Sequence, residues 1–495
     1  MHTTTTHEHK QLACNCIRHG MPSFLLLAFS CFTISRRSLI SGLSSFVSTS
    51  KMAAKPEHSS SLRILVHGGD NMLGRAVQLS FPVQASGEEL IRDSCTAAHY
   101  VDLSLDHPSG RKHDINLKEI RALNAKKGHY LWGDYQGMQI TPPPDIKLLN
   151  VETAVTKSIH NADLPEWKGI RYHMHEDNFE NIMSGFCQET HGGDKAIPVV
   201  VNFANNHAMD YGRKAMEEES IPLFERLKSD TFQTVGLGLT LEQASKPATI
   251  ACKSTSVQVF SFSAGCSGTP AEWWATKSRS GLLGLPGLHS KQDVDSAISI
   301  AKLAFKREPK SDSHLRIVSI HWGPNWAMKG EGEEDLAARR EFAHRLIDEC
   351  GVDMIYGHSS HHVRGMEVYR DKLILYGAGD IINDYEGFEN RGEERYNRLG
   401  GIYVVDVDAN SGKFHQLRIV PMYMNRLRLE RFIPSSSIWR PNQRRLEQNP
   451  NNSKDFCDFL NELSLLDAGG RENALLMEHR ESDPQLPGGP VLTSA

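Results

Sequence analysis

Three histidines stand within five residues in the stretch GHSSHH, residues 357–362, directly after the apolar run VDMIY. Other polar residues with potential ligand atoms follow other apolar runs of the chain. Together the candidates are Asp70, Glu152, Asn206, His207, His321, His358, His361 and His362. Oxygen and nitrogen donors without a thiolate suit Mn, Fe, Zn or Mg better than a cysteine-bound structural zinc. Carboxylates and several imidazoles from distant segments are also what a site for two metal ions requires.

Each of these residues also has an ordinary structural explanation. Asp70, in GGDN, could form a turn or cap a helix, and Glu152 could begin a helix in ETAVT. Asn206 could supply loop hydrogen bonds, and His321 could be a core histidine whose ring is satisfied. GHSSHH could be a solvated loop. Because several histidine-bearing segments each end a predicted buried strand, coincidence is the weaker explanation, and we expect a metal site.

Six short β-branched runs must position these side chains, and each run ends in a cluster of Gly, Asn, Asp or His. They begin at Leu62, Asp145, Pro198, Leu315, Val352 and Lys372. Continuous apolar runs bounded by turn residues predict strands that are covered on both faces. Helical patterns lie between them at 213–228, where Pro222 predicts a kink or a restart, and at 333–350. This alternation predicts an α/β fold, in which ligands collect at the carboxyl ends of the strands.

The two ends of the chain differ from the part between them. The first fifty residues contain one acidic residue, Glu8, among many Ser and Thr, which is typical of a transit peptide. A short apolar core there also fits a secretory signal, and Met52 could be the real start. We predict a targeting-like or non-native extension at 1–60, a main domain at 61–435 and a polar C-terminal appendage at 436–495.

Composition and charge limit the classes of partner and compartment. Charged residues make up 23% of the 495 residues and the formal net charge is -5, which gives no sign of a nucleic-acid-binding surface. Nine cysteines without a CxxC pair favour a reducing compartment over a disulfide framework or a zinc ribbon. No window beyond the N-terminal segment has the apolar length of a membrane span. We expect an intracellular soluble protein, cytoplasmic or mitochondrial, and favour a secretory signal less.

The motifs resemble the capsule-biosynthesis CapA family, also called the poly-γ-glutamate synthesis family, of the metallophosphatase-like superfamily. The resemblance runs in chain order from about Arg63 to Met422. It is carried by GDNMLGR, NVETAVT, FANNHAMDYG, GLGLTLEQASKP, IHWGPNW, GHSSHHVRGMEVY and LILYGAGDIINDY. The resemblance implies a four-layer α/β/β/α sandwich, in which two mixed sheets lie between helices.

The resemblance also implies roles for individual residues. Asp70 matches the first metal-binding aspartate of the superfamily, and Glu152 matches its bridging carboxylate. The other implied metal ligands are Asn206, His321, His358 and His361. His207 would then protonate a leaving group, beside one or two divalent ions.

Several positions depart from the superfamily pattern. Met72 stands where the first motif normally has a histidine, two places after its aspartate. The bridging carboxylate is Glu152 rather than Asp, and Asp380 replaces the Asn of a common LGN pattern. A single metal, or a rearranged pair that uses His362 or Asp380, is therefore an alternative. Asn71 could also support or replace a ligand.

Three functions are compatible with these features. The first is a metal-dependent hydrolase, in which a metal-bound hydroxide attacks a phosphoester or related anionic substrate and His207 is the general acid. The second is a factor in poly-γ-glutamate synthesis, processing or export that acts on amide bonds. The third is a non-catalytic protein that binds an anion or a metal. The expected partner is a small or polymeric anionic molecule, and no oligomeric state is predicted.

Overall fold

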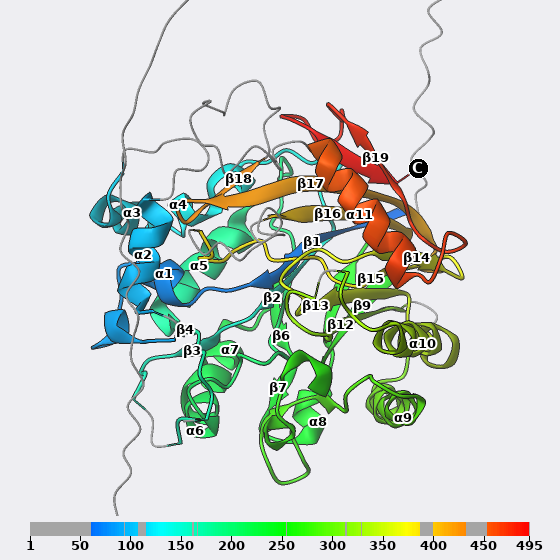
Figure 1. The fold of residues 1–495 in the computed structure, drawn as a ribbon, viewed down its shortest axis with the longest axis horizontal. Coiled ribbons are helices and arrows are strands. Elements are labelled where there is room, and N and C mark those ends of the chain that lie inside the picture. The colour runs from blue at the N-terminus through cyan, green and yellow to red at the C-terminus, as the bar shows by residue number, and fades with distance from the viewer. Residues whose placement is uncertain are drawn as a thin grey trace, which may run out of the picture. The chain divides into compact units, whose positions relative to one another are not determined.

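The structure is a computed structural model (Figure 1). It describes residues 61–431 and 453–494, apart from 94, 107–114, 161–162, 166, 254, 312–313, 328 and 387–398. The chain divides into a unit Met1–Pro56 and a unit Glu57–Ala495, and all described residues belong to the second. The predicted extension at 1–60 therefore lies outside the described residues, and the predicted domain boundaries stay predictions.

A mixed sheet forms one half of the described fold. Among the described residues it has nine strands, with β1 and β2 near its centre. Across the sheet the order is β19 (Met477–Arg480), β20 (Val491–Ser494), β17 (Phe414–Asn425), β16 (Leu399–Asp408), β1 (Ser61–Asn71), β2 (Ile146–Val151), β5 (Val199–Asn202) and β6 (Phe232–Val235), and β18 (Arg428–Arg431) pairs with β17. The strands β1, β2, β5 and β6 run parallel, so their carboxyl ends reach the same edge.

A second mixed sheet forms the other half and has seven strands in the described part of the chain. Its order is β11 (Gly284–Leu285), β9 (Thr255–Ala264), β12 (His314–His321), β13 (Met354–His358), β15 (Lys372–Leu375) and β14 (Met366–Tyr369), and β8 (Ala248–Cys252) pairs with β9. The strands β9, β12, β13 and β15 are parallel. Two short two-stranded pairs complete the described strands: β10 (Gly281–Leu282) with β7 (Leu237–Gly238), and β3 (Ala154–Thr156) with β4 (His173–His175).

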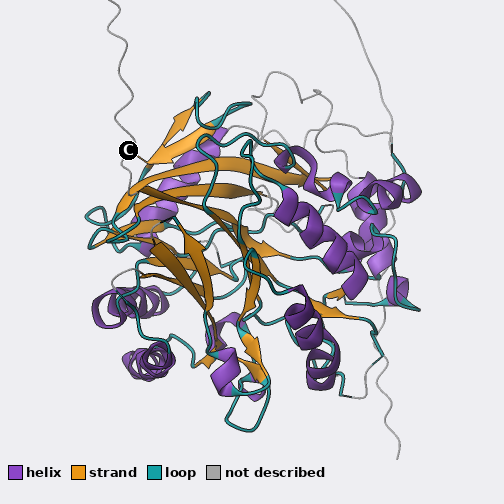
Figure 2. Cartoon of the chain, turned by 180° about the vertical axis from the view of Figure 1, so that it is seen from behind, coloured by secondary structure: helices purple, strands orange, loops and turns teal. Residues whose placement is uncertain are grey.

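Helices cover the outer faces of both sheets, as Figure 1 and the view from behind in Figure 2 show. The outer face of the nine-stranded sheet packs against α1, α2, α4, α5 and α7 in one apolar cluster, and the outer face of the seven-stranded sheet packs against α9 and α10 in another. The described helices are α1 (Arg75–Leu79), α2 (Ala97–Asp106), α3 (Leu117–Asn124), α4 (His129–Trp132), α5 (Glu176–Gln188), α6 (Arg213–Ala215), α7 (Ile221–Leu227), α8 (Leu241–Ala244), α9 (Lys291–Arg307), α10 (Glu333–Cys350) and α11 (Ser453–Asp467). The predicted four-layer α/β/β/α architecture is confirmed.

The apolar runs explain why the sheets are covered on both faces. In β1, Ile64 and Val66 join the core between the two sheets, whereas Leu65 joins the core under the helices. This division follows from the two-residue period of a strand. The six predicted runs form β1, β2, β5, β12, β13 and β15. The strand predictions are therefore confirmed. Burial on both faces explains why apolar residues dominate these runs, although polar side chains such as Arg63 and Lys147 are buried in them too.

The helical segment at 213–228 is interrupted, as its proline predicts. The helix α6 passes into a π-helical segment, Met216–Ser220, and α7 then begins with Pro222 in its first turn. Proline lacks a backbone donor, and the first turn of a helix is where that donor is not needed.

The described C-terminal residues 453–494 are part of the folded unit. Phe456 and Leu460 of α11 belong to the core cluster between the sheets, and β20 pairs with β17. Asp467, at the end of α11, accepts hydrogen bonds from the Arg364 guanidinium and from the backbone N–H of Gly365. The helix is thereby tied to the segment that follows GHSSHH.

The two sheets are joined where β1 ends. The backbone N–H of Gly69 donates to the carbonyl of Gly379 (2.5 Å), and that of Ile381 donates to the carbonyl of Asp70 (3.1 Å). A Cβ atom on Gly69 would lie 2.7 Å from the Gly379 carbonyl oxygen, so only glycine allows this approach. The contact brings the segment after β15 beside the end of β1.

Within the described residues, no helix combines the length and the apolarity needed to cross a membrane.

A buried histidine next to α5 makes stability depend on pH. The ring of His191 lies 3.0 Å from the Met138 carbonyl and 3.0 Å from the Tyr135 hydroxyl. Burial lowers the pKa of His191 to about 3. Between pH 6.5 and 3 the unfolded chain binds a proton here that the folded chain does not, so this contribution to stability is lost as the pH falls through that window.

We expect His191→Asn to flatten the pH profile of the unfolding free energy. Asn tolerates the left-handed backbone of this position (φ 51°), and it does not titrate. Below about pH 6 the wild-type profile should be steeper by up to about 1.4 kcal/mol per pH unit. Urea unfolding between pH 7 and 4 measures the slope, with His99→Asn, at an exposed histidine, as control. Parallel wild-type and His191→Asn profiles would refute this prediction.

Candidate metal centre

The candidate ligands lie at the carboxyl ends of parallel strands from both sheets. Asp70 is next to the last residue of β1, and Glu152 directly follows β2. His321 and His358 are the last residues of β12 and β13 and are paired in the parallel register. Asn206 follows β5 within a short turn. The topology thus places these residues at the edge that the sequence predicts.

One group of potential ligands consists of Asp70, His321 and His358, whose ligand atoms all lie within 4.8 Å of one another. Oδ1 of Asp70 is 3.6 Å from His321 Nδ1 and 3.8 Å from His358 Nδ1. The two Nδ1 atoms are themselves 2.8 Å apart. All three side chains are buried. Nitrogen atoms that converge in this way fit a cation between them, because each has a lone pair to donate.

A second group consists of Asp70, His361 and Asp380, within the same limit of 4.8 Å. Nδ1 of His361 is 3.0 Å from Oδ2 of Asp380. Asp70 thus belongs to both groups of potential ligands found among the described residues. A carboxylate that is shared between two ions is typical of a two-metal site.

Glu152 lies beside both groups. Its Oε1 is 3.6 Å from His321 Nε2, and its Oε2 is 3.9 Å from His361 Nδ1. The side chain is fully buried, and neither oxygen has a hydrogen-bond partner in the described part of the chain. A buried carboxylate without partners is costly, and a bound cation would remove that cost.

The electrostatics of the centre also favour a bound cation. Burial, reinforced by neighbouring carboxylates, raises the pKa of Asp70 to about 7 and that of Glu152 well above its usual range. Burial lowers the pKa of His358 to about 3 and that of His321 well below 6.5, so both rings are neutral and able to coordinate. For His361, burial is outweighed by Asp380 and Glu152, which raise its pKa to about 10. A divalent ion would favour ionised carboxylates and a deprotonated His361.

Hydrogen bonds from outside the groups orient the ligands. Oγ of Ser319 lies 2.8 Å from Nε2 of His358, which leaves Nδ1 directed at the centre. The amide of Asn150 donates to Oδ1 of Asp70 (2.7 Å), and the backbone N–H of Ser359 donates to Oδ2 (2.8 Å). Partners of this kind fix the ring and carboxylate orientations that a metal requires.

His207 faces the centre from the turn after β5. Its Nδ1 is 2.6 Å from Oδ2 of Asp210, and its Nε2 is 3.9 Å from Oε1 of Glu152. Lys168 also pairs with Asp210 and donates to the Asn206 carbonyl, and the Tyr172 ring stacks on the imidazole at 4.0 Å. Burial lowers the pKa of His207 to about 4. The histidine is therefore a neutral ring whose Nε2 is directed at the candidate ligands.

Asn206 adjoins the first group, because its Oδ1 is 3.0 Å from His321 Nε2. Two other predicted positions have different surroundings. Asn71 lies 2.9 Å from Nδ1 of His67, on the side of β1 opposite to Asp70. His362 has its Nδ1 2.7 Å from the Val363 carbonyl and belongs to neither group of described ligands. Met72, in place of the usual histidine, is buried.

The sequence patterns did not indicate Asp210, Lys168 and Tyr172 as parts of the site. Asp210 follows His207 by three residues, a spacing that lets a turn bring both side chains together and that could have pointed to it. Lys168 lies in a segment without hydrophobic periodicity, so no pattern in the sequence indicated its position.

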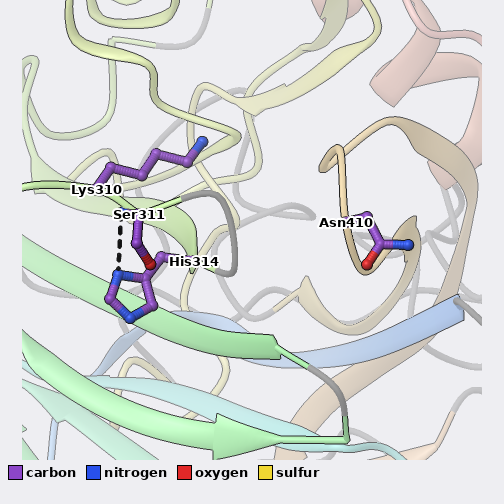
Figure 3. A pocket seen from close by; sticks show the side chains of 4 residues that line it. All are labelled: Lys310, Ser311, His314 and Asn410. Carbon is purple, nitrogen blue, oxygen red and sulfur yellow. Dashed lines mark hydrogen bonds between the residues drawn. The ribbon is translucent and has the colours of Figure 1, made fainter.

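A hollow at the opposite end of β12 is distinct from this centre. Lys310, Ser311 and His314 line one side of it, and Asn410 faces them (Figure 3). His314 begins β12 and His321 ends it, which separates the two positions by roughly 23 Å at about 3.3 Å per residue. Lys310 is already bonded to the Gly351 carbonyl and paired with Asp353.

The four layers, with two mixed sheets between helices, define a metallophosphatase-like fold. The chain belongs to the bacterial capsule synthesis protein PGA_cap family, whose model matches residues 64–385. The predicted membership of the CapA family is confirmed.

Curated relatives extend the likeness over most of the chain. A "probable polyglutamine synthesis accessory protein" of Mycobacterium tuberculosis is 33% identical over 376 residues, which cover 76% of this chain and 88% of the relative. The "PGA biosynthesis protein CapA" of Bacillus subtilis is 28% identical over 185 residues, 37% of this chain and 42% of that protein. A solved structure titled "GAP50 the anchor in the inner membrane complex of Plasmodium" covers 74% of this chain and 85% of its own, with a TM-score of 0.28 and 10% identity, and supports no inference.

Proposed function

We propose that this protein is a metal-dependent hydrolase that acts on a phosphoester or a related anionic substrate. The observation that carries the proposal is the pair of ligand groups that share Asp70, beside the unpartnered carboxylate of Glu152. Such a constellation is expensive to bury, and a divalent cation is the partner that would offset the cost.

The donor set fits one or two divalent ions. Asp70, His321 and His358 would hold one ion, and Asp70, His361 and Asp380 would hold the other, with Glu152 close to both. Mixed imidazole and carboxylate donors suit Mn, Fe or Zn, and carboxylates also suit Mg. A divalent ion held here would supply Lewis acidity and a water activated for attack near neutral pH.

His207 would move the proton of the reaction. Its Nδ1–H donates to Asp210, so Nε2 is the atom that faces the substrate. In this position Nε2 can take up a proton during attack and deliver it to the leaving group, as a general acid does. Lys168 holds Asp210 in place, and Tyr172 fixes the plane of the ring.

The names of the relatives favour a second candidate function. One is named a probable polyglutamine synthesis accessory protein and another a PGA biosynthesis protein. The substrate could therefore be a polymer with amide bonds, such as the carboxylate-rich poly-γ-glutamate, and the role could be its synthesis, processing or export. The same centre could polarise an amide carbonyl. The missing histidine at Met72 supports a third candidate, a protein that binds an anion or a metal without turnover.

A substrate screen tests these candidates. The full chain, loaded with Mn²⁺, Fe²⁺, Zn²⁺ or Mg²⁺ in turn, is assayed on phosphomonoesters, phosphodiesters and poly-γ-glutamate, beside His321→Ala. We expect turnover of one class that needs metal and falls at least about 100-fold in the variant, because ligand loss disables the centre. His314→Ala, at the opposite end of the same strand, should retain activity. Turnover that persists in His321→Ala would refute the hydrolase.

A further inference from the structure

Two tyrosines contact the rings of His207 and His361. The Tyr172 ring stacks on the His207 ring at 4.0 Å, and the Tyr385 ring meets the His361 ring edge to face at 5.8 Å. The two hydroxyl oxygens are 3.2 Å apart. Burial, with a smaller contribution from the carboxylate of Glu152, raises the pKa of both phenols well above its usual range. The two tyrosines, bonded through their hydroxyl groups, therefore connect the ring of the proposed general acid, His207, to the ring of one candidate ligand, His361.

Arg75 holds this pair in place. Its guanidinium carbon lies 5.0 Å from the centre of the Tyr172 ring and 5.6 Å from that of Tyr385. Asp384 and Asp93 bind the same guanidinium. Arg75 has a left-handed backbone (φ 48°), which a non-glycine residue keeps only where its surroundings enforce it. Because two carboxylates already pair with Arg75, the guanidinium is not available to an anionic substrate.

The hydroxyl pair has one proton to spare. Two phenols carry two protons, and the bond between them uses one. Among the described residues, no acceptor other than the partner phenol is found for either hydroxyl. The remaining phenol O–H is an uncharged hydrogen-bond donor near Asp380 and Glu152, whose carboxylates would repel an anion. The Tyr385 side chain is partly exposed.

We propose that Tyr172 and Tyr385 form a substrate-binding pair, whose spare phenol proton is donated to a non-bridging oxygen of the phosphoryl or acyl group bound at the centre. This inference rests on the proposed function, because it gives that site its donor for the substrate oxygen. Such donors stabilise charge that develops on oxygen during attack.

Phosphate binding tests the pair independently of turnover. Manganese-loaded full-length protein is titrated with inorganic phosphate by calorimetry, for the wild type and for the double variant Tyr172→Phe/Tyr385→Phe. The rings remain, so stacking on His207 and His361 is preserved. We expect the Kd to rise about tenfold or more, as loss of a hydrogen bond to a charged group does, with unchanged manganese content. The control is Tyr100→Phe. The Tyr100 ring packs against the Arg75 guanidinium and its hydroxyl donates to Asp93, so this variant also loses a hydroxyl beside Arg75 but should bind phosphate with the wild-type affinity.

The outcomes separate this inference from the proposed function. Weaker phosphate binding by the double variant, with wild-type affinity in the Tyr100→Phe control, supports the pair. This holds even where no substrate is turned over and the proposed hydrolase activity is not found. Equal affinity in the double variant and the wild type would overturn the pair, even where metal-dependent turnover is found. Failure of the manganese-loaded wild type to bind phosphate would also overturn it, and the turnover screen then decides the hydrolase separately.

Discussion

Asp70→Asn is expected to empty both metal positions, lowering the metal content from about two ions per chain to near zero. Asp70 is shared by the two ligand groups, so its replacement affects both positions. The amide has nearly the shape of the carboxylate but lacks its charge, and hard cations depend on that charge. Turnover should fall to background. Elemental mass spectrometry of the purified variant gives the metal content directly.

Asp380→Asn is the matched variant for this prediction. Asp380 belongs to one group only, so its replacement should remove about one ion and leave the ion held by Asp70, His321 and His358. Asp406→Asn controls for the loss of a buried aspartate, because Asp406 pairs with Arg63 at the far end of β1. That variant should lose stability and keep its metal. Full metal content in Asp70→Asn would contradict the shared-carboxylate centre.

His207→Gln is expected to lower kcat by about 100-fold to 10,000-fold while the metal content stays normal. His207 belongs to neither ligand group, and its Nε2 is 3.9 Å from Oε1 of Glu152. Gln retains polarity and bulk but cannot carry the proton to a leaving group. Steady-state kinetics and metal analysis on the same preparation separate the two effects.

His344→Gln provides the control for this substitution. His344 lies on α10 and bonds to Glu367, outside the candidate centre. We expect its kinetics to match those of the wild type. The role assigned to His207 would be wrong if His207→Gln kept the wild-type kcat, or if its activity fell only in proportion to lost metal.

The strand ends were predictable because two simple patterns coincide in this chain. Buried parallel strands appear as uninterrupted apolar runs, and the polar residues directly after such runs must gather at one edge. This is why the amino-acid sequence alone predicts that Asp70, His321 and His358 lie together. The role of each candidate residue remains a prediction, which the substitutions at these positions test.

Contacts between the sheets were not predictable in the same way. Asp380 reaches Asp70 because the backbone after β15 is hydrogen-bonded to the end of β1 at Gly69 and Gly379. That contact joins segments about 300 residues apart, and no periodic pattern encodes it. The support of His207 by Lys168 likewise depends on a loop whose course the sequence does not indicate.

Side-chain alternation, by contrast, could have separated Asn71 from Asp70. Successive residues of a strand point to opposite faces, so the neighbour of a ligand in an extended strand faces away from it. Asn71 accordingly binds His67 on the side of the helices, while Asp70 lies in the centre.

The most direct test of the shared-carboxylate centre is the metal content of the wild-type full chain, measured by elemental mass spectrometry after purification without chelators. We predict about two equivalents of Mn, Fe, Zn or Mg per chain, restored on reloading after chelation. Protein that contains no divalent metal, and takes up none on incubation with each of the four ions, would contradict the metal centre and the hydrolase with it.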